Sequence, residues 1–298
     1  MSSTGPQDDY LLSRDYIDCD RLNLQHSLWT KIFGYLLHPC IDTSSPTLTI
    51  ADIGTGTASW LTDLSALLPA TCQLDGFDID TSQAPPKEWL PANVSLHEWD
   101  VFTELPEHLI GRYDVVHVRL LVFVVKGDPT PILRNLVRML KPGGWLQWAE
   151  PDVRTMRILT AKAMPQPGAP HSGSDADVDT PSDDADTNAD TNPGMSRLFS
   201  LSASQDPRLV PQWPSQLDDC FRAEGLTDVL VHRVAEAPPH LEFAMHQCNL
   251  LMYEMFASRA PGPRAKEILD WVPRAAEETR RGAMFAFERV SFVGCKSK

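Results

Sequence analysis

The 298-residue sequence lacks any long hydrophobic run. No stretch of about 18 consecutive apolar residues is present, so no transmembrane helix is expected. The N-terminal stretch MSSTGPQDDY has no basic segment followed by an apolar one, and no secretory signal peptide is predicted. We therefore expect a cytoplasmic protein that has no membrane partner.

Clustered basic residues and paired cysteines are also missing. The 26 Lys and Arg residues are outnumbered by 40 Asp and Glu residues, and a formal net charge of -14 argues against a nucleic-acid backbone as the main partner. The six cysteines are scattered, with no Cys-x-x-Cys pair and no Cys/His cluster of the zinc type. We interpret them as free thiols in a reducing compartment, and no metal site is predicted.

One stretch lacks basic side chains altogether. Residues 163–193 contain no Lys or Arg and hardly any apolar residue, while seven aspartates lie among Ser, Thr, Pro and Gly. Such a stretch buries too little surface to offset the entropy of ordering it, so residues 161–194 are predicted to be an acidic, disordered insertion. A calcium-binding loop is the alternative, although the glycine and the terminal glutamate of a helix–loop–helix calcium site are missing.

Strand and helix patterns alternate through the first half of the chain. Residues 10–40 have helical spacing of apolar side chains, and later segments alternate between short apolar runs and amphipathic stretches. This order is typical of a parallel sheet with helices on both faces. The predicted strands are residues 47–53, 72–78, 94–99, 113–118, 145–150, 226–234 and 285–295, and the main later helices are 128–140, 215–223, 242–258 and 266–281.

The stretch IADIGTGTASW, residues 50–60, joins the first predicted strand to a helix. Gly54 and Gly56 let a ligand lie against the backbone, and the following helix offers free N–H groups to a carboxylate or a phosphate. A dinucleotide fingerprint needs a third glycine where this chain has Ser59, which counts against NAD or FAD. A purely structural tight turn is the alternative interpretation.

Acidic residues follow the next two strands. Asp78, in GFDID, ends the second strand at a position where a carboxylate accepts both hydroxyls of a ribose. Asp100, in HEWDVF, is placed to accept the exocyclic amine of an adenine, with Val101 beside the ring. Asp78 and Asp80 together have a second interpretation, a metal-binding acid pair of a nucleotide-sugar enzyme.

Five motifs in one order carry a family resemblance. DIGTGTASW, GFDID, EWDVFTELP, YDVVHVRLL and LKPGGWLQWAEPD resemble the motifs of class I S-adenosylmethionine-dependent methyltransferases over about residues 46–152. RLNLQH at residues 21–26, HVR at 117–119 and GGWLQWAE are similar to a narrower group, the fungal secondary-metabolism methyltransferases of the LaeA-like and gliotoxin N-methyltransferase-like type. The family's usual third glycine is Ala58 here, a small residue.

The resemblance implies an α/β fold, a Rossmann-like seven-stranded methyltransferase sheet with an N-terminal helical lid and inserted helices. The lid covers residues 1–45 and the cofactor-binding core residues 46–160. The acidic insertion follows at 161–194, and residues 195–298 complete the fold with helices that cover the substrate.

The resemblance implies S-adenosyl-L-methionine as the cofactor. It also implies which residues bind each part of that molecule. The set is Asp52, Gly54, Thr55 and Gly56 around the methionine part, Asp78 and Ile79 at the ribose, Asp100 and Val101 at the adenine, and Gln25 and Arg119 beside them.

Three side chains are candidates for catalysis. His26 and His117 are possible general bases because histidine titrates near neutrality, and the alternative for each is a histidine that fills the fold or hydrogen-bonds the backbone. Glu150, at the end of the fifth predicted strand, either orients a substrate amine or hydroxyl or caps the next segment.

Trp148, Met252, Tyr253 and Phe256 are the candidate substrate-binding residues. The last three lie on one predicted helix of the type that covers the substrate in the resembling family, and they imply an apolar small molecule. The alternative for all four is a place in the hydrophobic core.

The predicted activity is in-line transfer of a methyl group to an O or N atom of a small secondary metabolite. Two other functions stay open at this point. One is a methyltransferase fold that catalyses another reaction, such as a cyclisation, and the other is a LaeA-like regulatory protein.

Overall fold

The structure is a computed structural model that describes residues 11–161, 191–204, 206–259 and 263–298. Most of the predicted acidic insertion, residues 162–190, lies outside the described residues. The disorder and the calcium loop proposed for this stretch therefore stay predictions, as do the bounds of the four predicted segments.

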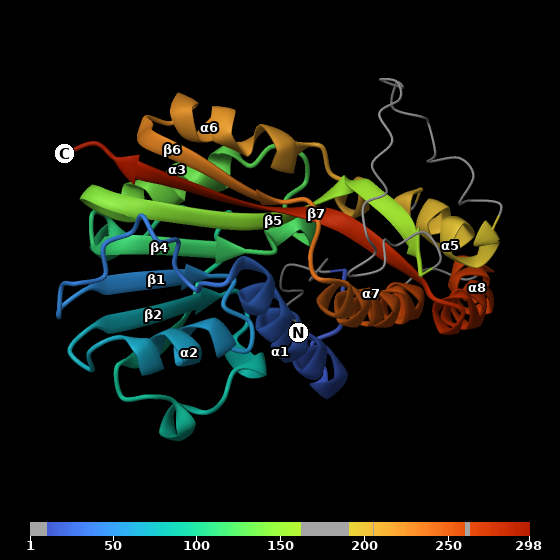
Figure 1. The fold of residues 1–298 in the computed structure, drawn as a ribbon. Coiled ribbons are helices and arrows are strands. Elements are labelled where there is room, and N and C mark those ends of the chain that lie inside the picture. Colours follow the sequence, from blue (N-terminus) through green and yellow to red (C-terminus); the bar gives the residue numbers. More distant parts are fainter. Residues whose placement is uncertain (1–10, 162–190, 205, 260–262) are drawn as a thin grey trace, which may run out of the picture.

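A seven-stranded sheet runs through the molecule with the strand order β3-β2-β1-β4-β5-β7-β6 (Figure 1). The pairs from β3 to β5 are parallel, whereas β7 is antiparallel to both β5 and β6. This confirms the predicted Rossmann-like class. The strands are β1 (Thr49–Ile53), β2 (Gln73–Asp78), β3 (Val94–Glu98), β4 (Tyr113–Arg119), β5 (Leu140–Thr160), β6 (Leu226–Val234) and β7 (Ala283–Lys296).

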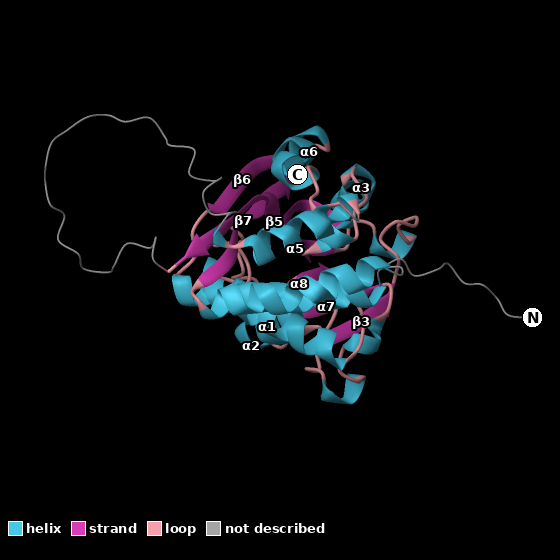
Figure 2. Cartoon of the chain, turned by 90° about the vertical axis from the view of Figure 1, so that its right-hand side faces the viewer, coloured by secondary structure: helices cyan, strands magenta, loops and turns pink. Residues whose placement is uncertain are grey.

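Helices cover both faces of the sheet, with α1 and α2 on one side and α3 and α6 on the other (Figure 2). Consecutive residues of β4 point to opposite faces, so Val115 packs with Trp60 of α2 while Val116 packs with Leu133 of α3. No described helix has the length and apolarity needed to cross a membrane. The helices are α1 (Tyr16–Phe33), α2 (Ser59–Leu67), α3 (Thr130–Met139), α5 (Pro193–Ala203), α6 (Leu217–Ala223), α7 (Pro239–Arg259) and α8 (Pro263–Arg280).

The N-terminal helix α1 begins and ends at residues suited to these positions. Asp15 is the N-cap, and its carboxylate accepts two N–H bonds from the first turn at 3.0 Å each. Gly34 ends the helix with a φ of 79°, a left-handed conformation that favours glycine. Between these ends, Leu28 packs against Met245 of α7, which fixes α1 beside the carboxyl edge of the sheet.

Strand β5 is much longer than the predicted segment 145–150. It pairs with β7 from Trp145 to Thr160, with an irregular register between Asp152 and Arg157. The sequence after Pro151 has no strand-like alternation, and it is the pairing with β7 that keeps this part extended. This two-stranded extension packs against α5, α7 and α8 (Figure 1), whose apolar side chains form a second core around Phe285.

Candidate active site

The Gly54–Gly56 turn joins β1 to α2 at the carboxyl edge of the sheet. Both glycines have positive φ, 69° and 54°, and a Cβ atom on Gly54 would lie only 2.9 Å from Leu121 Cδ2. The N–H groups of Gly54 and Thr55 both donate to the Phe77 carbonyl, at 2.8 and 3.1 Å. Strand β2 therefore holds the turn in a conformation that only glycine adopts easily.

Ala58 occupies the position at which the resembling family usually has its third glycine. Its φ of 58° is left-handed, and it is the fully buried N-cap of α2. A left-handed alanine costs on the order of 1–2 kcal/mol, so the turn keeps its shape at a modest expense in stability.

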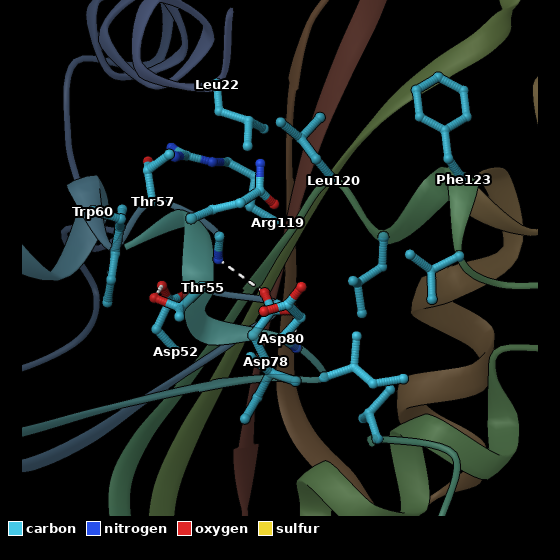
Figure 3. Close-up of a pocket in the computed structure, with 18 of the residues that line it drawn as sticks. Leu22, Asp52, Thr55, Thr57, Trp60, Asp78, Asp80, Arg119, Leu120 and Phe123 are labelled. Carbon is cyan, nitrogen blue, oxygen red and sulfur yellow. Dashed lines mark hydrogen bonds between the residues drawn. The ribbon is translucent and has the colours of Figure 1, made fainter. Parts of the chain in front are cut away.

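A cavity of about 660 Å³ opens at this edge of the sheet, a volume typical of small-molecule sites. Figure 3 shows the carboxylates of Asp52, Asp78 and Asp80 on one side of it, and Leu120 and Phe123 on the other. His26 and His117 also line it. So do all the residues predicted to bind the cofactor: Gln25, Asp52, Gly54, Thr55, Gly56, Asp78, Ile79, Asp100, Val101 and Arg119.

Asp52 is held by two side-chain donors on the cavity wall. Its Oδ1 accepts a hydrogen bond from His117 Nδ1 at 2.7 Å, and its Oδ2 accepts one from Thr55 Oγ1 at 2.8 Å. The His117 ring stacks on Trp60 with a centroid distance of 3.8 Å. Burial lowers the pKa of His117, which keeps the ring neutral. This geometry supports a role for His117 in orienting Asp52 rather than the predicted role of general base.

His26, from α1, connects Arg119 to Asp63. Arg119 Nη2 donates to His26 Nδ1 at 2.7 Å, and His26 Nε2 donates to Asp63 Oδ2 at 2.9 Å, because a guanidinium group only donates. Burial, followed by the Arg119 charge, lowers the pKa of His26. Burial also lowers the pKa of Arg119 to about 10, so the guanidinium stays charged at neutral pH. Both ring nitrogens of His26 are engaged, and the predicted base has no lone pair to offer.

Asp78 lies at the end of β2, directly below the glycine turn. Its Oδ2 accepts the Gly56 N–H at 2.9 Å (Figure 3), and burial raises its pKa. Asp80 instead accepts the Ser82 N–H at 2.9 Å and lies 4.0 Å from the Arg14 guanidinium. Within the described part of the chain, no group of three or more His, Cys, Asp or Glu side chains is arranged to hold a metal ion.

Asp100 and Val101 follow β3 and form the next part of the wall. Asp100 Oδ1 accepts the Phe102 N–H at 2.9 Å, which orients the carboxyl group. Asn135 of α3 donates to the Val101 carbonyl at 3.1 Å, while the Val101 side chain packs on the core. Successive strand ends thus bring three acids, Asp52, Asp78 and Asp100, to one cavity.

A smaller cavity of about 90 Å³ adjoins the first, and Leu22, Gln25, Leu120 and Phe123 line both. Three predicted substrate-binding residues of α7 form part of its wall, namely Met252, Tyr253 and Phe256. The rest of the wall is mostly apolar and includes Trp29 of α1, Phe199 of α5, Met156 of β5, and Phe285 and Phe287 of β7.

Glu150 and Trp148 line neither of these cavities, which corrects two predictions. Glu150 is fully buried and accepts hydrogen bonds from Leu121 N (2.8 Å), Trp148 Nε1 (2.7 Å) and Val122 N (3.2 Å). Burial outweighs these bonds and raises its pKa to about 8. Trp148 packs against Trp213 in the core. Both side chains point to the face of β5 that α3 and α6 cover, and Glu150 holds the turn after β4 through the Leu121 and Val122 N–H groups.

The sequence reasoning missed Arg21 and Asn249, which both line the smaller cavity. Arg21 Nε donates to Asp18 Oδ1 at 2.9 Å, and Arg21 Nη1 donates to Gln25 Oε1 at 3.1 Å. Asn249 precedes Tyr253 by one helical turn on α7. A signal was present, because each is a polar residue among apolar ones on a predicted helix, but such residues are usually solvent-exposed.

Comparison with known proteins connects this site to one class of enzyme. Residues 51–146, which contain the glycine turn and the ends of β1 to β4, match a protein family described as a methyltransferase domain. A phosphoethanolamine N-methyltransferase of Haemonchus contortus shares the fold, with a TM-score of 0.53 and 13% identity over 99% of this chain and 61% of that one. Residues 51–146 therefore resemble a methyltransferase domain, and the resemblance that the motifs predicted is confirmed.

Fungal methyltransferases are among its sequence relatives. The N-methyltransferase tcpN of Claviceps purpurea is 39% identical over 46% of this chain and 50% of its own length. The methyltransferase grgD of a Penicillium species is 38% identical over 56% and 66%, respectively. The N-methyltransferase gliN of Aspergillus fumigatus is 31% identical over 53% and 56%. The chain thus spans about half to two thirds of these relatives, and the predicted resemblance to fungal secondary-metabolism enzymes is confirmed.

Proposed function

We propose that this chain binds S-adenosylmethionine in the 660 Å³ cavity and transfers its methyl group to a small molecule, with a nitrogen atom as the favoured acceptor and oxygen as the other. The observation that carries the proposal is the convergence of Asp52, Asp78 and Asp100 on one cavity beside the Gly54–Gly56 turn. The names of the relatives, N-methyltransferases in several cases, support the reaction type.

The donor set fits the cofactor. Asp78, at the end of β2, is in position to accept the ribose hydroxyls, with Ile79 beside it, and Asp100 with Val101 to hold the adenine. The positive φ values of Gly54 and Gly56 leave room for the methionine part against the backbone. Asp52 and the charged Arg119 are suited to the ammonium and carboxylate groups of that part, respectively.

The remaining contributions of the chain are to position groups and to exclude water. When bound, S-adenosylmethionine supplies an electrophilic methyl group on its sulfonium sulfur. Gln25 and Leu22, from α1, line both cavities and separate the bound groups from solvent. His26 fixes the Arg119 guanidinium, and His117 fixes the Asp52 carboxylate, so that the donor is held in one orientation.

The acceptor atom is proposed from the state of the candidate bases. His26 uses both ring nitrogens, His117 holds Asp52, and Glu150 accepts three protein donors outside the cavities. An amine that arrives uncharged already has a lone pair and needs no base to remove a proton before attack, unlike a hydroxyl group. We therefore favour nitrogen over oxygen.

The proposed setting is the cytoplasm, with a small secondary metabolite as substrate and with neither nucleic acid nor membrane as partner. All six cysteines are free thiols, as a reducing compartment would leave them.

Calorimetric titration with S-adenosylmethionine and with S-adenosylhomocysteine tests the proposal. We expect saturable binding of both at one site per chain. Incubation with labelled S-adenosylmethionine and a panel of aromatic amines is then followed by mass spectrometry, where a methylated product is heavier by about 14 mass units. No heat of binding for either compound would refute the assignment.

A further inference from the structure

We infer that the 90 Å³ cavity is the acceptor pocket, and that it takes an uncharged, apolar ring whose one polar group is hydrogen-bonded by Asn249 and Tyr253. The inference rests on the proposed function, and it goes further by naming the residues that select the acceptor and the chemical class they select.

Two polar side chains of α7 enter this cavity without a protein partner. Asn249 is 6% exposed and Tyr253 is 8% exposed, and both line the cavity. Among the described residues, neither the Asn249 carboxamide nor the Tyr253 hydroxyl makes a hydrogen bond. Burial raises the pKa of Tyr253, so its O–H stays protonated and able to donate. A ligand that supplies a partner to these two groups gains hydrogen bonds that the protein itself does not make.

The other walls exclude a charged ligand group. Arg21 is the charged side chain among the residues that line the cavity, and its guanidinium is already bound by Asp18, with a shortest distance of 2.8 Å. A carboxylate or an ammonium group placed here would lose its hydration without gaining an opposite charge. The walls instead provide aromatic ring surfaces. The ring centroids of Phe123 and Phe256 are 5.7 Å apart in an edge-to-face contact, and those of Tyr253 and Phe285 are 5.8 Å apart.

Size and position complete the argument. A cavity of about 90 Å³ is small for a whole metabolite, so it holds one ring while the rest of the acceptor extends toward the larger cavity. Gln25 and Leu22 line both cavities, which brings a ring seated beside Asn249 next to the proposed methyl donor.

Phenol and toluene are a matched pair of probes, because they have nearly the same shape and differ in the hydroxyl group. Binding of each is measured by ligand-observed NMR with the full chain saturated with S-adenosylhomocysteine, and then without it. We expect Tyr253→Phe and Asn249→Leu each to weaken the binding of phenol by about three- to tenfold, as for the loss of one hydrogen bond. The affinity for toluene should be unchanged. Benzoate and benzylammonium should not bind.

Tyr16→Phe is the matched control, since Tyr16 is 77% exposed and away from the cavity. Unchanged affinity for S-adenosylhomocysteine reports that each variant is folded. Equal phenol affinity in wild type and both pocket variants, absence of phenol binding to the wild type, or binding of benzoate as tight as that of phenol would each overturn the inference. Failure of S-adenosylhomocysteine to bind would instead refute the proposed function, and the phenol and toluene comparison without it still decides the pocket.

Discussion

The two adjoining cavities are built in different ways. The larger one is formed mainly by the ends of β1, β2, β3 and β4, where each strand contributes neighbouring residues, and α1 adds Leu22, Gln25 and His26. The smaller one takes its side chains from α1, α5, α7, β5, β7 and the segment after β4. Two residues of its wall, Arg21 and Phe285, are more than 200 residues apart in the chain. A parallel sheet therefore supplies a polar site from local sequence, whereas an apolar pocket depends on how distant helices pack.

Leu120 lies between the two regions and lines both cavities. Its φ of 64° is left-handed, which is strained for a branched side chain. Its N–H donates to the Ala149 carbonyl at 3.1 Å, and the next two N–H groups donate to Glu150. The buried carboxyl group of Glu150 thus holds the strained turn that lies between the two cavities.

The largest expected effect is a loss of stability in the region around the smaller cavity. Glu242 of α7 and Arg289 of β7 form a buried pair with hydrogen bonds of 2.8 and 2.9 Å. Glu242→Ala leaves a buried guanidinium unpaired and should lower the free energy of unfolding by about 3–5 kcal/mol. Urea denaturation measures this loss, with Glu277→Ala as control, since the exposed Glu277–Arg280 pair should contribute far less to stability than the buried pair. Equal losses in the two variants would contradict the prediction.

Glu150→Gln tests the turn between the cavities. The amide would direct its NH₂ group at backbone donors, so a loss of about 1–3 kcal/mol in stability is expected. The folded-state pKa of Glu150 is about 8, above its ordinary value of 4.5, so its favourable contribution is full below 4.5 and is lost as the pH rises toward 8. Denaturation at several pH values should therefore show a smaller decline between these limits in Glu150→Gln than in wild type, and parallel curves would disprove the role.

Asp78→Ala tests whether the two cavities are independent. Loss of a charged hydrogen-bond acceptor should weaken the binding of S-adenosylmethionine by about an order of magnitude or more, as measured by calorimetry. The binding of toluene in the smaller cavity should stay unchanged. Asp42→Ala is the control, because the exposed Asp42 carboxylate accepts the Ser44 N–H and lines neither cavity. An unchanged cofactor affinity in Asp78→Ala would remove Asp78 from the proposed site.

The smallest expected effect is the difference in stability loss between alanine variants of two glycines with similar φ. Gly34→Ala introduces only left-handed strain, as no atom lies within 4 Å of the new Cβ, and should cost about 1–2 kcal/mol. Gly54→Ala has the same strain and also brings Cβ to 2.9 Å from Leu121 Cδ2. Thermal and urea unfolding should show a larger loss for Gly54→Ala, and the difference measures how tightly the turn is packed. Equal losses would mean that Leu121 moves freely.

The sequence by itself determined the parallel sheet, the glycine turn and the acids at the strand ends. These features are local: the apolar run, the turn and the next acid lie within a few residues of one another, and parallel strands bring their carboxyl ends to one edge. All the residues predicted to bind the cofactor accordingly line one cavity.

Only the tertiary structure decided which side chains reach that cavity and what their free atoms can do. Glu150 and Trp148 sit at the right place in sequence but on the face of β5 that packs on the core, and His26 has both ring nitrogens bound. Asn249 acquires its environment from α1 and β7, which are distant in the chain. Burial and hydrogen bonding depend on the sum of such distant contacts, and no local pattern encodes that sum.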